Sequence, residues 1–183
     1  MTRHSVLVRA THWINFLSFL ALAVSGVAIL LAHPRFYWGE TGYFDTPAAF
    51  ELPLRVNLDQ TGWGRDLHFL AAWIAVVNGI IYVAWGLLSR HFRYRDYKVL
   101  QRLAYLSVLF GLLPVTILTG LTLSPAVTAA YPVLFTMFGG RQSARTIHFF
   151  AADLLVLFLI VHVTMTIREG LVNSMITGVV ETE

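Results

Sequence analysis

Four stretches of the sequence are each long and apolar enough to cross the hydrocarbon core of a bilayer as a helix. A spanning helix needs about 20 predominantly apolar residues, whereas a barrel strand needs only about ten. The stretches cover about residues 11–32, 66–89, 103–123 and 146–167. Because isolated strands cannot satisfy their backbone inside lipid, each stretch predicts an α-helix. We therefore expect an all-α fold, an integral membrane four-helix bundle that forms a single domain over residues 1–183.

The composition excludes a water-soluble enzyme. Of the 183 residues, 57% are hydrophobic and 13% are charged, against about 25% charged residues in ordinary soluble domains. There is no cysteine, which excludes disulfides, thiolate-bound zinc, iron–sulfur clusters and covalently attached c-type haem. The seven histidines are then the strongest nitrogen ligands available for a metal. No internal repeat or low-complexity segment is evident.

The distribution of lysine and arginine predicts how the helices are oriented. Eight of these residues lie before the first stretch, between the second and third, or after the fourth. Five lie in the two long loops, at about 33–65 and 124–145. The positive-inside rule then predicts that both termini are cytoplasmic and that the long loops face outward. The net charge of +3 reports this orientation, and we expect no nucleic-acid partner.

The first stretch has a basic start, as a signal peptide does. Its apolar run is longer than that of a signal peptide, and no small-residue cleavage site follows it. We therefore expect a retained span in contact with the lipid bilayer.

Four histidines lie inside the apolar stretches, at two matched depths. With the predicted orientation, His12 and His162 are near the cytoplasmic face, and His68 and His148 are near the outer face. His162 follows His148 by fourteen residues, which is about 21 Å of helix and just under four turns. The two therefore share one face of the fourth helix. The other histidines, expected to be exposed polar residues, are His4, His33 and His91.

Each depth thus has two histidines from different helices. Bis-histidine ligation of haem needs one neutral imidazole on each side of a flat macrocycle. We predict two b-type haems, with His68 and His148 as axial ligands of the outer one and His12 and His162 as those of the inner one. A lone buried histidine is usually a hydrogen-bonded core residue, and a proton path through a haem-free scaffold or transporter subunit is the alternative for the set.

Arginines precede three of these histidines by one helical turn. Arg9, Arg65 and Arg145 each lie three residues before a predicted ligand, and Arg141 is also on the outer side. A guanidinium binds a carboxylate bidentately, so the haem propionates are their expected partners. Arginines also flank membrane spans for reasons of topology alone, and both interpretations stay open.

Two further positions in the spans are of interest. Gly26 is fourteen residues after His12, so it shares a helix face with His12 and is expected to leave room for the outer haem. Asp153 is the one carboxylate well inside a span. A polar contact, a proton path and a partner subunit are all open for it.

The placement of the histidines resembles the bacterial di-haem cytochrome b family. This family includes b561-type cytochromes and the membrane subunits of formate dehydrogenases and nickel–iron hydrogenases. The resemblance covers essentially the whole chain and is closest to the thiosulfate-reductase-type cytochrome b subunits. The segments that carry it are residues 9–13, 33–42, 62–69, 117–122 and 139–149. It implies a bacterial inner-membrane protein whose partner is a periplasmic molybdopterin oxidoreductase of the sulfite-oxidase type.

The expected function is electron transfer between the membrane quinone pool and this periplasmic redox partner, as a subunit more than as a stand-alone enzyme. The alternative within redox chemistry is a stand-alone b561-type oxidoreductase of a small oxidant such as superoxide. Side chains near the inner haem that could hydrogen bond a quinone are Arg9, Trp13, Asn15, Arg102, Arg168 and Asn173. The aromatic residues of the first outer loop predict either a docking surface or an interfacial belt; they are Phe36, Tyr37, Trp38, Tyr43, Phe44, Phe50 and Trp63.

Overall fold

Four long helices dominate the structure, a computed structural model that describes residues 5–42, 45–53, 62–89 and 99–178. The helices that are long and apolar enough to cross a membrane are Val6–Ala32, Trp63–Leu88, Gln101–Thr122 and Arg141–Arg168. The four predicted spans are thereby confirmed. His4, Arg3, His91 and the basic segment at 90–98, on which part of the orientation rests, lie outside the described residues.

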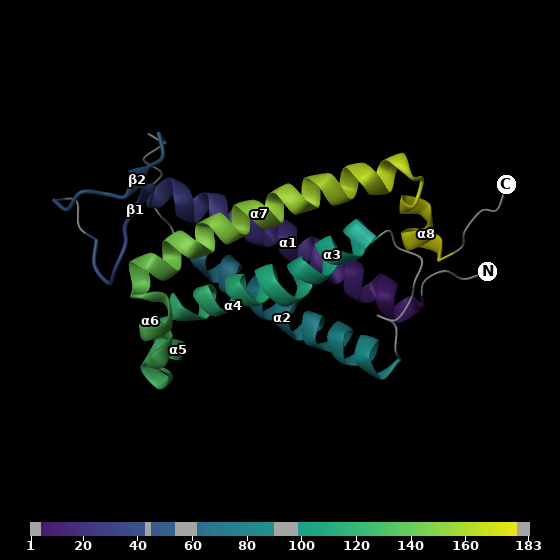
Figure 1. The fold of residues 1–183 in the computed structure, drawn as a ribbon, viewed down its shortest axis with the longest axis horizontal. Coiled ribbons are helices and arrows are strands. Elements are labelled where there is room, and N and C mark those ends of the chain that lie inside the picture. The colour runs from purple at the N-terminus through teal and green to yellow at the C-terminus, as the bar shows by residue number, and fades with distance from the viewer. Residues whose placement is uncertain (1–4, 43–44, 54–61, 90–98, 179–183) are drawn as a thin grey trace. The chain divides into compact units, whose positions relative to one another are not determined.

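The elements follow one another in an almost wholly helical order (Figure 1). They are α1 (Val6–Ala32), β1 (Arg35–Phe36), β2 (Phe50–Glu51), α2 (Trp63–Leu88), α3 (Val99–Ser107), the π-helical segment η2 (Val108–Leu112), α4 (Leu113–Thr122), α5 (Pro125–Ala130), α6 (Val133–Phe138), α7 (Arg141–Arg168) and α8 (Val172–Thr177). Both α1 and α7 begin five residues before the predicted spans. The apolar run marks only the part inside the hydrocarbon, and the helix continues through the interface.

The chain divides into two compact units. The first unit contains Met1–Leu30, Asp59–Asp96 and Leu159–Glu183, and the second contains Leu31–Leu58 and Tyr97–Phe158. The first therefore holds most of α1, all of α2, the end of α7, and α8. The second holds β1, β2, the helices from α3 to α6, and the larger part of α7.

Small hydroxyl side chains are buried in this protein, while large apolar ones are exposed. Ser25, Thr119 and Thr146 have exposed fractions of 0%, whereas Leu88 reaches 87% and Ile80 63%. In lipid no hydrophobic force drives helices together, so small residues that allow close approach and satisfied hydroxyl groups fill the contacts. The burial pattern is thus that of a membrane protein.

In the first unit, α1 and α2 are joined at two levels. The side-chain amide of Asn78 in α2 donates to the backbone carbonyl of Thr11 in α1, at 2.7 Å. At the other end of α1, a Cβ atom on Gly64 would lie 3.2 Å from that of Ala28. The helix backbones are close there because position 64 has no side chain.

The short helix α8 follows α7 and is tied to the beginning of α1 (Figure 1). Trp13 Nε1 donates to the Met175 carbonyl at 3.2 Å. The Arg9 guanidinium donates to the carbonyls of Met175 and Ile176. A cation at these carbonyls complements the negative end of the helix dipole, so Arg9 and Trp13 together cap α8.

The third span in the second unit contains a wide turn next to a proline. The Leu113 N–H bonds to the Val108 carbonyl, five residues back, where an α-helix would reach back four. Pro114 follows directly and has no N–H to donate. Single π-turns of this kind allow a helix to pass a proline, and they connect α3 to α4 as one span.

The loop between α1 and α2 packs against the start of α7 through a two-stranded hairpin. Strand β1 pairs antiparallel with β2, with Phe36 opposite Phe50, and these two rings stack with centroids 4.6 Å apart. Phe36 also contacts Phe149 of α7 at 4.6 Å. Phe36 and Tyr37 are buried, at 2% and 8% exposed. They are therefore core residues of this unit and form neither a docking surface nor an interfacial belt.

Polar bonds fix the same loop to the first turns of α7. The carbonyl of Gly39 accepts from the backbone N–H groups of Gln142 and Ser143, at 3.0 and 3.1 Å. In return Ser143 Oγ accepts from the Gly39 N–H at 2.7 Å, and Thr146 Oγ1 donates to the Tyr37 carbonyl at 2.8 Å. These bonds satisfy the N-terminal end of α7 and hold the loop one to two turns from His148.

Candidate functional site

The two predicted inner ligands lie together in the first unit. His12 comes from α1 and His162 from the end of α7, and their ring centroids are 6.3 Å apart with an angle of 53° between the planes. Two metal–nitrogen bonds of about 2 Å, plus the half-widths of two rings, put imidazoles that share one metal about 6 Å apart. The separation therefore fits a haem iron between the two rings.

Neighbouring side chains define the surroundings of His12. Trp13 lies edge-on to its ring at 5.5 Å, and the Asn78 bond to the Thr11 carbonyl holds α2 beside the same turn of α1. Trp13 is in turn fixed by its bond to α8. The position of His12 is thus supported by α2 and α8 as well as by its own helix.

His68 in α2 is bound by a hydroxyl group of α1. Ser25 Oγ lies 2.9 Å from His68 Nδ1, and the Leu22 carbonyl also interacts with the ring. The Ser25 hydroxyl is within donor distance of the carbonyls of Ala21 and Leu22, at 2.6 and 3.1 Å. Since its hydrogen is directed to its own helix, the hydroxyl oxygen accepts a hydrogen from Nδ1.

His148 in α7 is bound in the same way by α4. Its Nδ1 lies 3.0 Å from the Thr116 carbonyl and 3.0 Å from Thr119 Oγ1. A carbonyl oxygen can only accept, so we assign the hydrogen of the neutral ring to Nδ1. The lone pair is then on Nε2, which is the tautomer that metal-bound histidines with such partners adopt.

Glycines lie next to both of these rings. A Cβ atom on Gly26 would lie 3.7 Å from His68 Cε1, and one on Gly120 would lie 3.2 Å from His148 Cε1. Gly26, predicted to leave room for the outer haem, is therefore next to a predicted ligand. Each imidazole thus lies opposite a glycine of the neighbouring helix, at a place where a larger residue would bring its Cβ atom against the ring.

A family model for prokaryotic cytochrome b561 matches residues 3–178. This chain belongs to the prokaryotic cytochrome b561 family. It is accordingly a multi-pass membrane protein of the bacterial inner membrane and a b-type haem cytochrome with a role in electron transport. Membership confirms the resemblance to b561-type cytochromes and disfavours the haem-free scaffold.

A curated relative extends the comparison. The cytochrome is 29% identical over 192 residues to the putative protein-methionine-sulfoxide reductase subunit YedZ1 of Azospira oryzae, and the match covers 88% of each chain.

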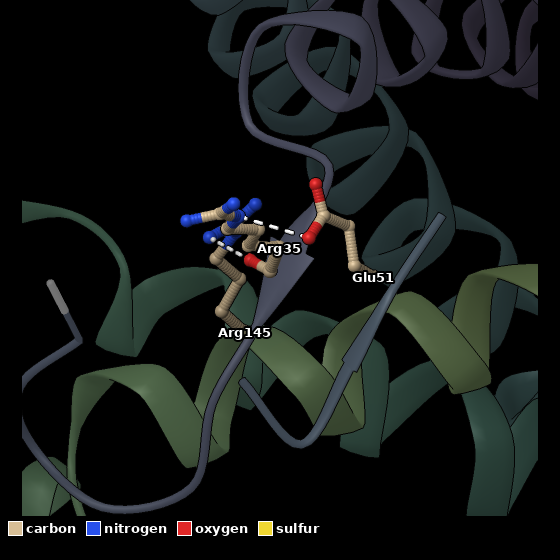
Figure 2. Close-up of polar contacts among 3 residues, drawn as sticks. All are labelled: Arg35, Glu51 and Arg145. Carbon is tan, nitrogen blue, oxygen red and sulfur yellow. Dashed lines mark hydrogen bonds and ion pairs between the residues drawn. The ribbon is translucent and has the colours of Figure 1, made fainter. Parts of the chain in front are cut away.

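The arginines of the cytochrome have different surroundings. Arg145 donates to the carbonyl of Arg35 (Figure 2). It also donates to the carbonyl of His33 and lies over the Phe36 ring, 4.9 Å from its centroid. Arg141 lies over the Phe135 ring at 5.6 Å, and Arg65 is exposed. Arg9 caps α8. A guanidinium has five donors, so pairing with propionates stays a prediction for all four.

Several residues around the histidines were missed in the sequence. They are Ser25, Asn78, Thr116 and Thr119. A hydroxyl or amide inside an apolar span is a signal in itself, because it must find a partner there. The sequence does not show which partner, since serine and threonine also bond to their own helix.

Proposed function

We propose that this cytochrome passes electrons between the membrane quinone pool and a periplasmic redox enzyme, using two b-type haems. The observation that carries the proposal is the 6.3 Å separation of the His12 and His162 rings. It fits the ligation of one haem by the two histidines predicted at the inner depth. The tautomer assigned to His148 supports a second haem on the outer side.

In this proposal His12 and His162 hold the inner haem, and His68 and His148 hold the outer one. His68 belongs to the first unit and His148 to the second, so their pairing rests on the sequence. The proposal includes the single four-span domain, with both termini in the cytoplasm and the long loops outside.

The haem iron supplies one-electron chemistry. The residues of the chain hold neutral imidazoles in position and keep water away from them. Ser25, Thr116 and Thr119 keep hydrogen on the Nδ1 atoms, so that the Nε2 atoms act as ligands. The apolar spans provide a low dielectric, which disfavours charged histidine and thereby favours the form that binds metal.

The proposed partner is a periplasmic molybdopterin oxidoreductase of the sulfite-oxidase type. The relative from Azospira oryzae is named as a subunit of a putative protein-methionine-sulfoxide reductase. Similarity over most of the length to a chain that carries this name supports a subunit role here. Exposed Trp38 and Tyr131, at 59% and 64%, are outer-loop side chains available to such a partner.

The first experiment is to quantify haem in the purified full-length chain as the pyridine haemochrome, together with a reduced-minus-oxidised spectrum. Two b-type haems per chain are expected. One haem would contradict the two-haem pathway, and no haem would overturn the ligand assignment altogether.

A second experiment tests which molecules exchange electrons with the haems. Quinol added to membrane vesicles should reduce the haems, and a large periplasmic subunit should co-purify with the cytochrome. If instead the isolated chain reacts rapidly with superoxide and has no partner, the stand-alone oxidoreductase is the correct function.

A further inference from the structure

His68 and His148 are bound by two sets of groups that match each other in sequence spacing. Each set consists of a backbone carbonyl, a hydroxyl three residues later, and a glycine directly after the hydroxyl. The sets are Leu22, Ser25 and Gly26 in α1, and Thr116, Thr119 and Gly120 in α4. We call each set an imidazole cradle. Each cradle and its histidine lie within one unit.

The helices that carry the histidines match as well. Residues 65–72 read RDLHFLAA and residues 145–152 read RTIHFFAA, so arginine, histidine, phenylalanine and two alanines recur at the same spacing. This likeness is confined to eight residues around each histidine and does not make the two halves of the chain an internal repeat. The first two spans and the last two share one way of holding a histidine.

The chemistry of a cradle fixes the histidine in two respects. The hydroxyl hydrogen is directed to the helix carbonyls, at 2.7 and 3.0 Å for Thr119, so the oxygen can only accept from the ring. The carbonyl of Thr116 also accepts. Two acceptors on Nδ1 keep the hydrogen there, fix the ring orientation and increase the electron density on Nε2.

We propose that Ser25 and Thr119 are positioning residues for the outer haem, setting the tautomer and the ligand strength of His68 and His148. This inference rests on the proposed ligation of that haem. A ligand with higher electron density stabilises the ferric state, so the two hydroxyls lower the midpoint potential of the outer haem. They leave the inner haem unaffected, because its ligands lie elsewhere on the helices.

The test compares hydroxyl-deleting variants with matched controls. Thr119→Val removes the hydroxyl with little change of volume, and Ser25→Ala does so in the other cradle. Thr122→Val is the control for Thr119, because Thr122 is equally buried and its hydroxyl donates to the Leu118 carbonyl of its own helix. Ser18→Ala is the control for Ser25, being a buried serine of the same helix. Thr119→Ser restores the hydroxyl.

The readouts are redox titration of each haem, the low-spin ferric electron paramagnetic resonance signal, and the rate of haem transfer to excess apomyoglobin. In Thr119→Val and Ser25→Ala, one haem should move to higher potential with an altered signal and leave about 10- to 100-fold faster. The other haem, both controls and Thr119→Ser should resemble the wild type.

Two results would overturn the inference. In the first, the haem potentials of both hydroxyl-deleting variants equal those of the wild type. In the second, the haem potentials of the control variants shift as much as those of the hydroxyl-deleting variants. If Thr119→Val does not assemble, Ser25→Ala provides the same measurement. Failure of the proposed function has a different signature, because the wild-type chain itself would then lack two haems.

Discussion

His148 donates its Nδ1 hydrogen to the backbone carbonyl of Thr116 at 3.0 Å. Because a backbone carbonyl cannot be replaced by mutation of its own side chain, this bond persists in any Thr116 variant that folds. The tautomer of His148 is thus set by the main chain of α4, and Thr119 adds a second acceptor. The deletion of one hydroxyl should therefore weaken haem binding without abolishing it.

Replacement of single histidines should remove haems one at a time. His12→Ala or His162→Ala is expected to leave one haem per chain with the potential of the outer site, because an iron with one axial imidazole is held weakly. His68→Ala or His148→Ala should leave the inner haem instead. Pyridine haemochrome and redox titration measure both. His33→Ala is the control and should keep two haems.

The assignment of the histidines to two pairs by depth predicts which haem each histidine variant loses. If His12→Ala and His162→Ala removed different haems, or if each single change removed both haems from a folded protein, the assignment of the pairs would be incorrect.

The four spans and the positions of the histidines could be predicted because both depend on long-range regularities. A run of about 20 apolar residues has one stable structure in lipid, and a spacing of fourteen residues places two side chains on one helix face. The short elements could not be predicted in this way. The hairpin β1–β2 and the helices α5, α6 and α8 are too short for a periodic signal, and α8 is capped by Arg9, more than 160 residues away in sequence.

The imidazole cradles are the part of the site that the sequence pattern does not predict. A glycine inside a span, such as Gly120, fits ordinary helix packing as well as close approach to a cofactor, and Ser25 and Thr119 are single hydroxyl residues among apolar neighbours. Only the position of the imidazoles beside them identifies their role. The arginine, histidine and alanines shared by residues 65–72 and 145–152 can be seen in the sequence, but so few matching residues do not by themselves indicate a common site.

Addition of a methyl group at Gly120 should disturb the outer haem. A Cβ atom there would lie 3.2 Å from His148 Cε1, closer than most such contacts, whereas at Gly26 the distance to His68 Cε1 is 3.7 Å, an ordinary contact. We expect Gly120→Ala to alter the spectrum and reduce the content of the outer haem more than Gly26→Ala does. Gly111→Ala is the matched control, since nothing lies within 4 Å of its Cβ position.

An equal effect of Gly111→Ala would mean that helix packing of the third span, and not contact with the imidazole, determines the response. Normal haem content and an unchanged spectrum in Gly120→Ala would mean that the ring adjusts freely.

Gly140 should be needed for the junction between the α1–α2 loop and α7. Its φ of +108° is unfavourable for other residues, and this strain alone costs about 1–3 kcal/mol. A Cβ atom would also lie 2.5 Å from the carbonyl carbon of Gly39. Gly140→Ala should therefore lower the melting temperature of the detergent-solubilised protein. Gly39→Ala is the control, with a φ of +90° and nothing within 4 Å, so the difference between the two variants reports the steric clash. Equal melting temperatures would show that the loop moves away without cost.

Arg145 and Arg35 should differ in their effect on stability, although both belong to the hairpin region. Arg145 donates to the loop carbonyls of Arg35, as Figure 2 shows, and of His33. Hydrogen bonds from charged groups contribute about 1.5–3 kcal/mol. Arg145→Gln should lower the melting temperature, and a lowered potential of the outer haem would also be expected if Arg145 pairs with a propionate, because loss of the positive charge disfavours the reduced haem. Arg35 forms a partly exposed ion pair with Glu51 at 3.0 Å, so Arg35→Gln should have little effect.

The pH dependence follows from the same ion pair. The Glu51 carboxylate raises the pKa of Arg35 above its usual value, mainly through their hydrogen bond. A raised pKa in the folded state contributes stability that is fully present below the unfolded pKa and is lost only as the pH rises above it. Because that range lies far above neutrality, thermal unfolding between about pH 6 and pH 9 should change equally in the wild type and in Arg35→Gln. A difference between the two pH profiles in this range would show that Arg35 has another titrating partner.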